Sequence, residues 1–432
     1  MKKSLLAVAA IGAFASAAQA QSSVTVYGII DAGYIGSNAK EGAVSSAATG
    51  TQALKIQKSA FGQSAEQTSR LGFKGTEDLG GGASAFFTVE LGLTPQNSEL
   101  SGGTAEDRVQ KTTNASGSAV DNRQSFVGLK KNGIGQFAFG RQYTPVFNEG
   151  AATSPGQYNN IVGDVVYTSG SVFASSLTAT QGTNNGVGFT NRASNSLTAQ
   201  SDRFAGFQVG GIYSANNQNQ TEITAPGQTS AAANTGGNTN WGGWGLNGNF
   251  TWQKLYVGVA YQSFKTQYTT GVNVNTSVYN LGSVASTSGQ TIPAAAGSNV
   301  YSAAQISDKQ TLAGATYDFG ILKAYAQWVG RKVQNDYAGG QQVNRNAQQI
   351  GVRSYITPVV ESWASIGTGK YKLTADTTAA NFVGWQVGSN YYLSKRTNLY
   401  AIYGQTQTSS SSVNAGVGSS ANQYALGLRH TF

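Results

Sequence analysis

Apolar and polar residues alternate with a period of two along much of this chain. In the last nine residues, one set of alternating positions is largely apolar, and the other set is small or polar. The first set consists of Tyr424, Leu426, Leu428, His430 and Phe432. Because successive side chains of a strand point to opposite faces, this pattern predicts a strand with one apolar face. We expect that face to contact lipid and the strand to close a sheet.

The same alternation predicts sixteen strands in all. In the first of them, residues 23–34, Val24 and Val26 lie on one face and Tyr27 lies on the other. The remaining strands are expected near 67–77, 82–93, 122–131, 135–143, 189–201, 205–215, 242–252, 254–268, 308–318, 321–334, 346–357, 361–372, 381–393, 397–408 and 421–432.

The connections between these strands alternate between short turns and long polar stretches. The long stretches, rich in Ser, Thr, Asn, Gln and Gly, cover 38–66, 94–121, 144–188, 216–241, 269–307, 335–345, 373–380 and 409–420. A soluble sandwich has no reason to keep all turns short at one end, and a solenoid needs a fixed repeat that the spacing lacks. The pattern therefore predicts an all-β fold, a 16-stranded antiparallel transmembrane β-barrel with short periplasmic turns and long outer loops.

The first twenty residues have the pattern of a cleaved signal peptide. Lys2 and Lys3 precede an uncharged, Ala-rich stretch that ends in Ala18-Gln19-Ala20. We therefore expect a signal peptide over residues 1–20 and a barrel domain over residues 21–432. Loss of the two lysines lowers the formal net charge from +9 to +7, and the remaining basic residues are scattered. That scatter argues against nucleic-acid binding.

The inventory of reactive side chains argues against an enzyme. The chain has no Cys, and its one His is His430, which the alternation places on the lipid side. A Ser-His-Asp arrangement or a metal cluster has no histidine to use in the interior. We expect no catalytic residues, no cofactor and no metal site.

Several cations are expected to face the interior of the barrel. Arg70 and Lys74 share a face opposite Leu71, and Arg192 shares a face with Ser194. Arg123 is an exception, because strict alternation puts it on the apolar face of its strand. A β-bulge, or a position above the lipid boundary, would be needed to turn Arg123 inward.

Several motifs, taken together, resemble the general porins of Gram-negative bacteria, specifically the β-proteobacterial type. They are SSVTVYGIIDAGY, SRLGFKGTEDLGGG, RQSFVGL, GQFAFGRQYTP, LSKRTNLYAIYG and the terminal GLRHTF. The resemblance implies a homotrimer in the outer membrane and a third outer loop that folds inward to narrow each pore. Residues 144–188 occupy the place of that loop.

The resemblance also implies a cluster of arginines at the constriction in members that prefer anions. Arg70, Arg123 and Arg192 stand at the matching positions. Three further residues complete the candidate constriction: Lys74, and in the loop Glu149 and Asp164.

The hypothesis that follows is a porin for passive diffusion of small hydrophilic solutes and inorganic ions, biased toward anions. Its expected surroundings are outer-membrane lipid and lipopolysaccharide. Two alternatives stay open on the sequence. One is a channel specific for a solute such as an oligosaccharide, which would slide along aromatic rings such as those of Tyr27 and Trp244. The other is a surface receptor or adhesin that uses the long outer loops.

Overall fold

The computed structural model describes most of the barrel and part of its connections. The described residues are 23–46, 50–96, 100–101, 120–167, 190–220, 237–268, 291–292, 301–302, 304–335, 342–373, 378–409 and 419–432. The expected signal peptide, residues 1–20, lies outside them. No helix in the described part of the chain is long and apolar enough to cross a membrane.

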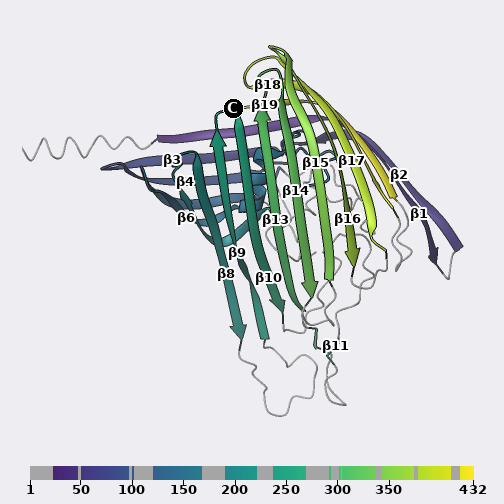
Figure 1. The fold of residues 1–432 in the computed structure, drawn as a ribbon, viewed down its shortest axis with the longest axis horizontal. Coiled ribbons are helices and arrows are strands. Elements are labelled where there is room, and N and C mark those ends of the chain that lie inside the picture. Colours follow the sequence, from purple (N-terminus) through teal and green to yellow (C-terminus); the bar gives the residue numbers. More distant parts are fainter. Residues whose placement is uncertain are drawn as a thin grey trace, which may run out of the picture.

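The described chain is dominated by one large antiparallel sheet, whose strands β8 to β18 stand side by side in Figure 1. The strands of this sheet are β1 (Ser23–Ser46), β2 (Gly50–Gln63), β3 (Arg70–Gly80), β4 (Ala83–Gly92), β5 (Asp121–Lys131), β6 (Gly135–Tyr143), β7 (Arg192–Ser201), β8 (Phe207–Gln220), β9 (Gly237–Trp252), β10 (Leu255–Tyr268), β13 (Ala304–Asp318), β14 (Lys323–Asn335), β15 (Gln342–Thr357), β16 (Val360–Leu373), β17 (Ala380–Tyr392), β18 (Thr397–Thr408) and β19 (Ser419–Thr431). A separate pair, β11 (Thr291–Ile292) and β12 (Tyr301–Ser302), and a helix, α2 (Pro145–Thr153), complete the elements.

The sheet closes into a barrel of sixteen strand positions. β2 and β3 share one position beside β1. β3 pairs with residues Ser23–Ile29 of β1, and β2 pairs with residues 32–46 of the same strand. On its other edge β1 pairs with β19, and the backbones of Gly28 and Phe432 exchange hydrogen bonds of 3.0 and 3.1 Å. The prediction that the last strand closes the sheet is confirmed.

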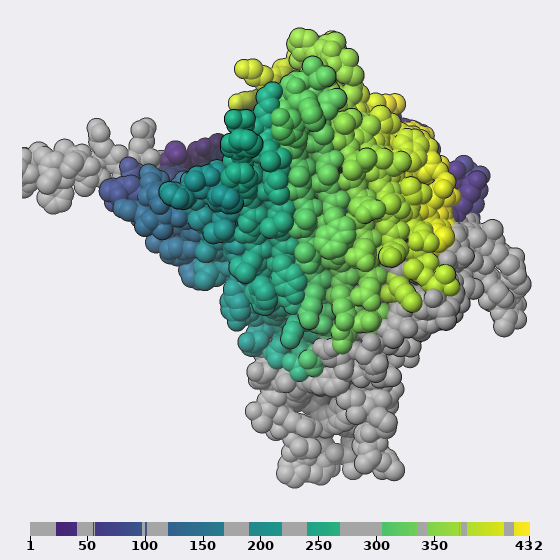
Figure 2. Space-filling view, viewed as in Figure 1, coloured from purple at the N-terminus to yellow at the C-terminus, as the bar shows by residue number. Residues whose placement is uncertain are grey.

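The two faces of the wall are reversed relative to a soluble protein. On β17, Val383, Trp385 and Val387 are exposed, whereas Gln386 and Asn390 on the opposite face are 1% and 0% exposed. Figure 2 shows the outer surface of these strands as one continuous wall. An apolar exterior and a polar interior are what a barrel in lipid requires.

The prediction of an outer loop over residues 38–66 is wrong for most of that range. β1 continues to Ser46, and β2 occupies Gly50–Gln63. In this part of the hairpin Lys40 pairs with Lys55, and both side chains are exposed. A strand with charges on its outer face has left the apolar band, so the alternation that marks the other strands is missing here.

Closure predicts that the barrel depends on β19. Deletion of residues 424–432 should abolish assembly. An open edge in lipid leaves backbone groups without hydrogen-bond partners, and each such group costs several kcal/mol of free energy. The measurement is the yield of heat-modifiable protein in the outer membrane. As a control, four residues removed from the 410–418 connection leave β19 intact and should preserve the yield. Normal assembly of the truncated chain would contradict the role given to β19.

Candidate functional site

Two arginines, Arg70 on β3 and Arg123 on β5, contact one carboxylate inside the barrel. Glu90 on β4 accepts a hydrogen bond of 2.8 Å from Nε of Arg123 on β5. Nη1 of Arg70, the first residue of β3, lies 3.8 Å from the same Oε1 atom. The other carboxylate oxygen accepts from the hydroxyl of Tyr27 at 3.1 Å. Glu90 thus holds two guanidinium groups and a tyrosine on one patch of the wall.

Tyr143, the last residue of β6, joins the third arginine to this patch. Its hydroxyl accepts from Nη2 of Arg123 at 2.8 Å and from Nη2 of Arg192 at 3.4 Å. The guanidinium of Arg192 also lies over the Tyr143 ring, 4.9 Å from its centroid. Tyr143 thus joins Arg123 and Arg192 through one hydroxyl group.

A β-bulge brings Arg123 to the cluster. The register between β4 and β5 shifts between Glu90, which pairs with Gln124, and Leu91, which pairs with Asn122. Arg123 is therefore skipped by the pairing, and its side chain is buried at 5% exposure. Of the two arrangements that could turn Arg123 inward, a bulge or a position above the lipid boundary, the structure has the bulge.

The cluster is strongly positive for a group of buried side chains. Arg192 and Glu90 are each 3% exposed, and two of the three guanidinium groups contact the Glu90 carboxylate. Glu90 and Tyr143 were not predicted from the sequence. A signal for Glu90 existed, because it is an acidic residue between Val89 and Leu91 in an apolar strand and alternates with them.

Lys74 lies beside the cluster on β3. Its Nζ atom is 5.4 Å from the centroid of the Tyr27 ring, and Tyr27 donates to Glu90. The structure therefore connects Lys74 to the three arginines through one aromatic side chain. Within the described residues, no group of three or more His, Cys, Asp and Glu side chains could hold a metal ion.

The chain turns inward directly after Tyr143. Thr144 caps α2, with its hydroxyl accepting from the N–H of Phe147, and Pro145 occupies the first turn. The helix packs on the inner side of β9, β10 and β13. Glu149 accepts hydrogen bonds from Asn247 at 2.7 Å, Asn249 at 2.9 Å and the Tyr256 hydroxyl. Its carboxylate is thus bound to the barrel wall at β9 and β10.

The segment after the helix, residues 154–167, crosses the interior on a series of side-chain amides from the wall. Gln386 contacts Asn159 and donates to the carbonyls of Ile161 and Val162 at 2.9 and 3.2 Å. Other inward glutamines bond backbone groups of α2 and of this segment. Gln262 bonds Val146 and Gln327 bonds Gly150 in the helix, whereas Gln349 bonds Val165 and Gln423 bonds Val162 in the segment. These side-chain amides provide hydrogen-bond partners for backbone N–H and C=O groups of the loop inside the barrel.

Asp164 serves the conformation of this loop. Its carboxylate accepts from the N–H groups of Val166 and Tyr167 at 2.9 Å and from the Ser154 hydroxyl at 3.2 Å. These bonds, like those of Glu149, lie within the loop or between the loop and the wall. The balancing carboxylate in contact with the arginines is Glu90.

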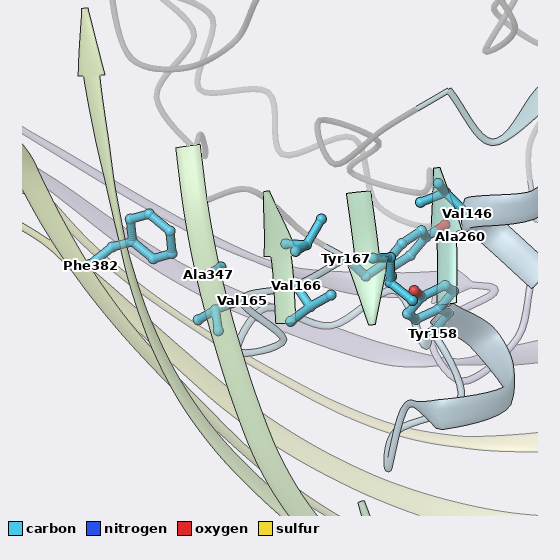
Figure 3. Close-up of a cluster of buried hydrophobic side chains, with 10 residues drawn as sticks. Val146, Tyr158, Val165, Val166, Tyr167, Ala260, Ala347 and Phe382 are labelled. Atoms are coloured by element: carbon cyan, nitrogen blue, oxygen red, sulfur yellow. The ribbon is translucent and has the colours of Figure 1, made fainter. Parts of the chain in front are cut away.

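Apolar packing also fixes the inward loop. Val165, Val166 and Tyr167 cluster with wall residues that include Ala347 and Phe382 (Figure 3). Tyr158 and Tyr167 stack with ring centroids 3.9 Å apart. Burial raises the pKa of Tyr158 well above its ordinary value, so its hydroxyl stays protonated.

Comparison with known proteins gives a consistent result. Residues 7–411 match a family model described as Gram-negative porin. An outer membrane porin protein of Bordetella pertussis is 40% identical over 144 residues, which are 33% of this chain and 34% of that protein. The chain therefore matches about a third of the length of this relative.

Two solved structures share the fold. An anion-selective porin from Comamonas acidovorans aligns with a TM-score of 0.61 and 22% identity, over 95% of this chain and 100% of that one. The trimer form of the outer membrane protein OmpT from Vibrio cholerae aligns with a TM-score of 0.55 and 12% identity, over 95% and 99%.

The amide contacts predict that Gln386 holds the inward loop. Gln386→Leu should loosen residues 156–167, because each buried group left without a partner costs about 1–3 kcal/mol. We expect faster hydrogen exchange in that segment and noisier single-channel current. Gln136→Leu is the control, because this exposed amide donates to Gln200 and lies away from the loop. Equal exchange in the two variants would contradict the anchoring role.

Proposed function

Because the chain belongs to the Gram-negative porin family, we propose that it forms a water-filled channel for passive diffusion of small hydrophilic solutes and ions, with a preference for anions. The channel lies in the outer membrane. Such transport needs no reaction centre, since pore width, hydration and the electric field of the wall decide what passes.

The observation that carries the anion preference is the division of the inner wall. α2 and residues 154–167 bond mainly to the wall from β9 to β19, whereas Arg70, Arg123 and Arg192 lie on the wall from β3 to β7. The loop reaches the edge of the cluster where Phe147 stacks on Tyr143, with ring centroids 4.3 Å apart, and where Asn160 donates to Ser64 and Thr68. Among the described residues, Glu90 is the carboxylate that contacts Arg70 and Arg123, whereas Glu149 and Asp164 bond to the wall and to the loop itself. Since guanidinium groups stay protonated, the cluster is positively charged.

The named relatives support two parts of this proposal. The Comamonas structure is described as anion-selective, and the Vibrio structure is described as a trimer. We propose the same ion preference and a homotrimer for this chain.

The aromatic side chains give less support to an oligosaccharide channel. Trp244 and Trp252 are 45% and 60% exposed, on the outer face and at a short turn. Tyr158 and Tyr167 are buried in the inward loop, and Tyr27 is bound to Glu90. Continuous rings for a sliding sugar are therefore not formed by these residues.

The arginine cluster predicts the ion preference of the pore. Replacing Arg70, Arg123 and Arg192 with glutamine should shift the reversal potential in a KCl gradient toward cations, most strongly at low salt. The same substitution of the exposed Lys40, Lys55 and Lys58 should barely move it, because solvent and salt screen those charges within about 8 Å at physiological ionic strength. A shift as large in the lysine variant would remove the cluster from its assigned role.

Removal of the Glu90 carboxylate should change the ion selectivity in the opposite direction. Glu90→Gln removes the carboxylate that offsets the three arginines and preserves the shape of the side chain. The variant should be more anion-selective than the parent, again as read from the reversal potential. Tyr27→Phe, which removes the neighbouring hydroxyl without changing charge, is the control. Unchanged or weaker anion selectivity in Glu90→Gln would contradict the electrostatic account.

A further inference from the structure

A row of outward residues crosses five neighbouring strands near the short-turn end of the barrel. Leu129 on β5 pairs with Phe137 on β6, and Phe137 pairs with Ala199 on β7. Ala199 pairs with Gly211 on β8, and Gly211 pairs with Leu246 on β9. Leu129, Phe137 and Leu246 are exposed on the outer face. The row therefore has two small residues at its centre and large apolar residues on both sides.

These residues line a groove of about 870 Å³. That volume falls within the range of about 300–1,000 Å³ typical of sites for small ligands. Val209, Leu79 and Ile134 extend its lining toward the turns that follow β3 and β5, and each is exposed. The groove is thus an apolar trough in a surface that faces lipid.

The groove has a cation at its short-turn end. Lys131 lies two residues beyond Leu129 on the same face of β5, and it is exposed. Its Nζ atom donates to the carbonyl of Gly81. Because an ammonium group has three N–H donors, Lys131 keeps further donors for an anionic group.

We propose that this groove binds one acyl chain of a phospholipid from the periplasmic leaflet, with the lipid phosphate at Lys131. A lipid at this position has its headgroup level with the short turns and its chain directed along the wall. That orientation matches the charge at one end of the groove and the apolar lining of the rest. Ala199 keeps the floor low between Phe137 and Val209, whereas the Leu246 side chain extends over Gly211.

The proposal concerns the outer wall and does not depend on ion preference. The test is native mass spectrometry of the intact protein, extracted in mild detergent and supplied with phosphatidylglycerol. We expect the parent to retain one tightly bound phosphatidylglycerol per protomer. Ala199→Phe fills the floor and should reduce retention at least fivefold. Ala401→Phe is the matched control, because Ala401 is an exposed outward residue on β18 outside the groove, and its retention should equal that of the parent.

Lys131→Gln tests the contact with the lipid phosphate separately from the contact with the acyl chain. It should weaken retention of phosphatidylglycerol but leave retention of diacylglycerol, which has no phosphate, unchanged. Equal retention by Ala199→Phe and Ala401→Phe would overturn the proposal. Loss of the oligomer in Ala199→Phe alone would also overturn it, because the groove would then be a contact between barrels. Heat modifiability and conductance of each variant show whether it has folded.

Discussion

Satisfaction of backbone hydrogen bonds inside a lipid bilayer is the constraint on which this structure depends. A strand edge left open in lipid has no water to bind, so the sheet must close on itself. The pairing of β1 with β19 closes the sheet, and the backbones of Gly28 and Phe432 exchange hydrogen bonds at this seam. The same constraint governs the inward loop, whose backbone is bonded by wall glutamines such as Gln386 and Gln349.

Closure also makes the charge distribution possible. Because the outer faces of the strands are apolar, polar side chains can line much of the interior, where Arg70 and Arg123 contact the buried carboxylate of Glu90. The loop bonds mainly to the other part of the wall. The hydrogen bonds of its acidic residues Glu149 and Asp164 described above go to the wall and to the loop backbone.

Much of the wall could be predicted from the sequence, because a period of two is visible wherever one face meets lipid. β2 was missed because charged and polar residues such as Lys55 and Lys58 stand among its apolar ones and neither face is continuously apolar. The site was predictable only in part. The inward direction of Arg70 follows from alternation, but the contacts of Glu149 with Asn247 and Tyr256 join segments about a hundred residues apart. Such contacts depend on barrel register and loop path, which local pattern does not encode.

The reversal potential of the unmodified protein in a planar bilayer, measured under a fixed KCl gradient at decreasing total salt, tests whether the buried arginine cluster sets the ion preference of the pore. The account predicts anion selectivity that grows as salt falls, because screening of the cluster weakens as the Debye length increases. A cation-selective pore, or a reversal potential of zero at every salt concentration, would contradict it.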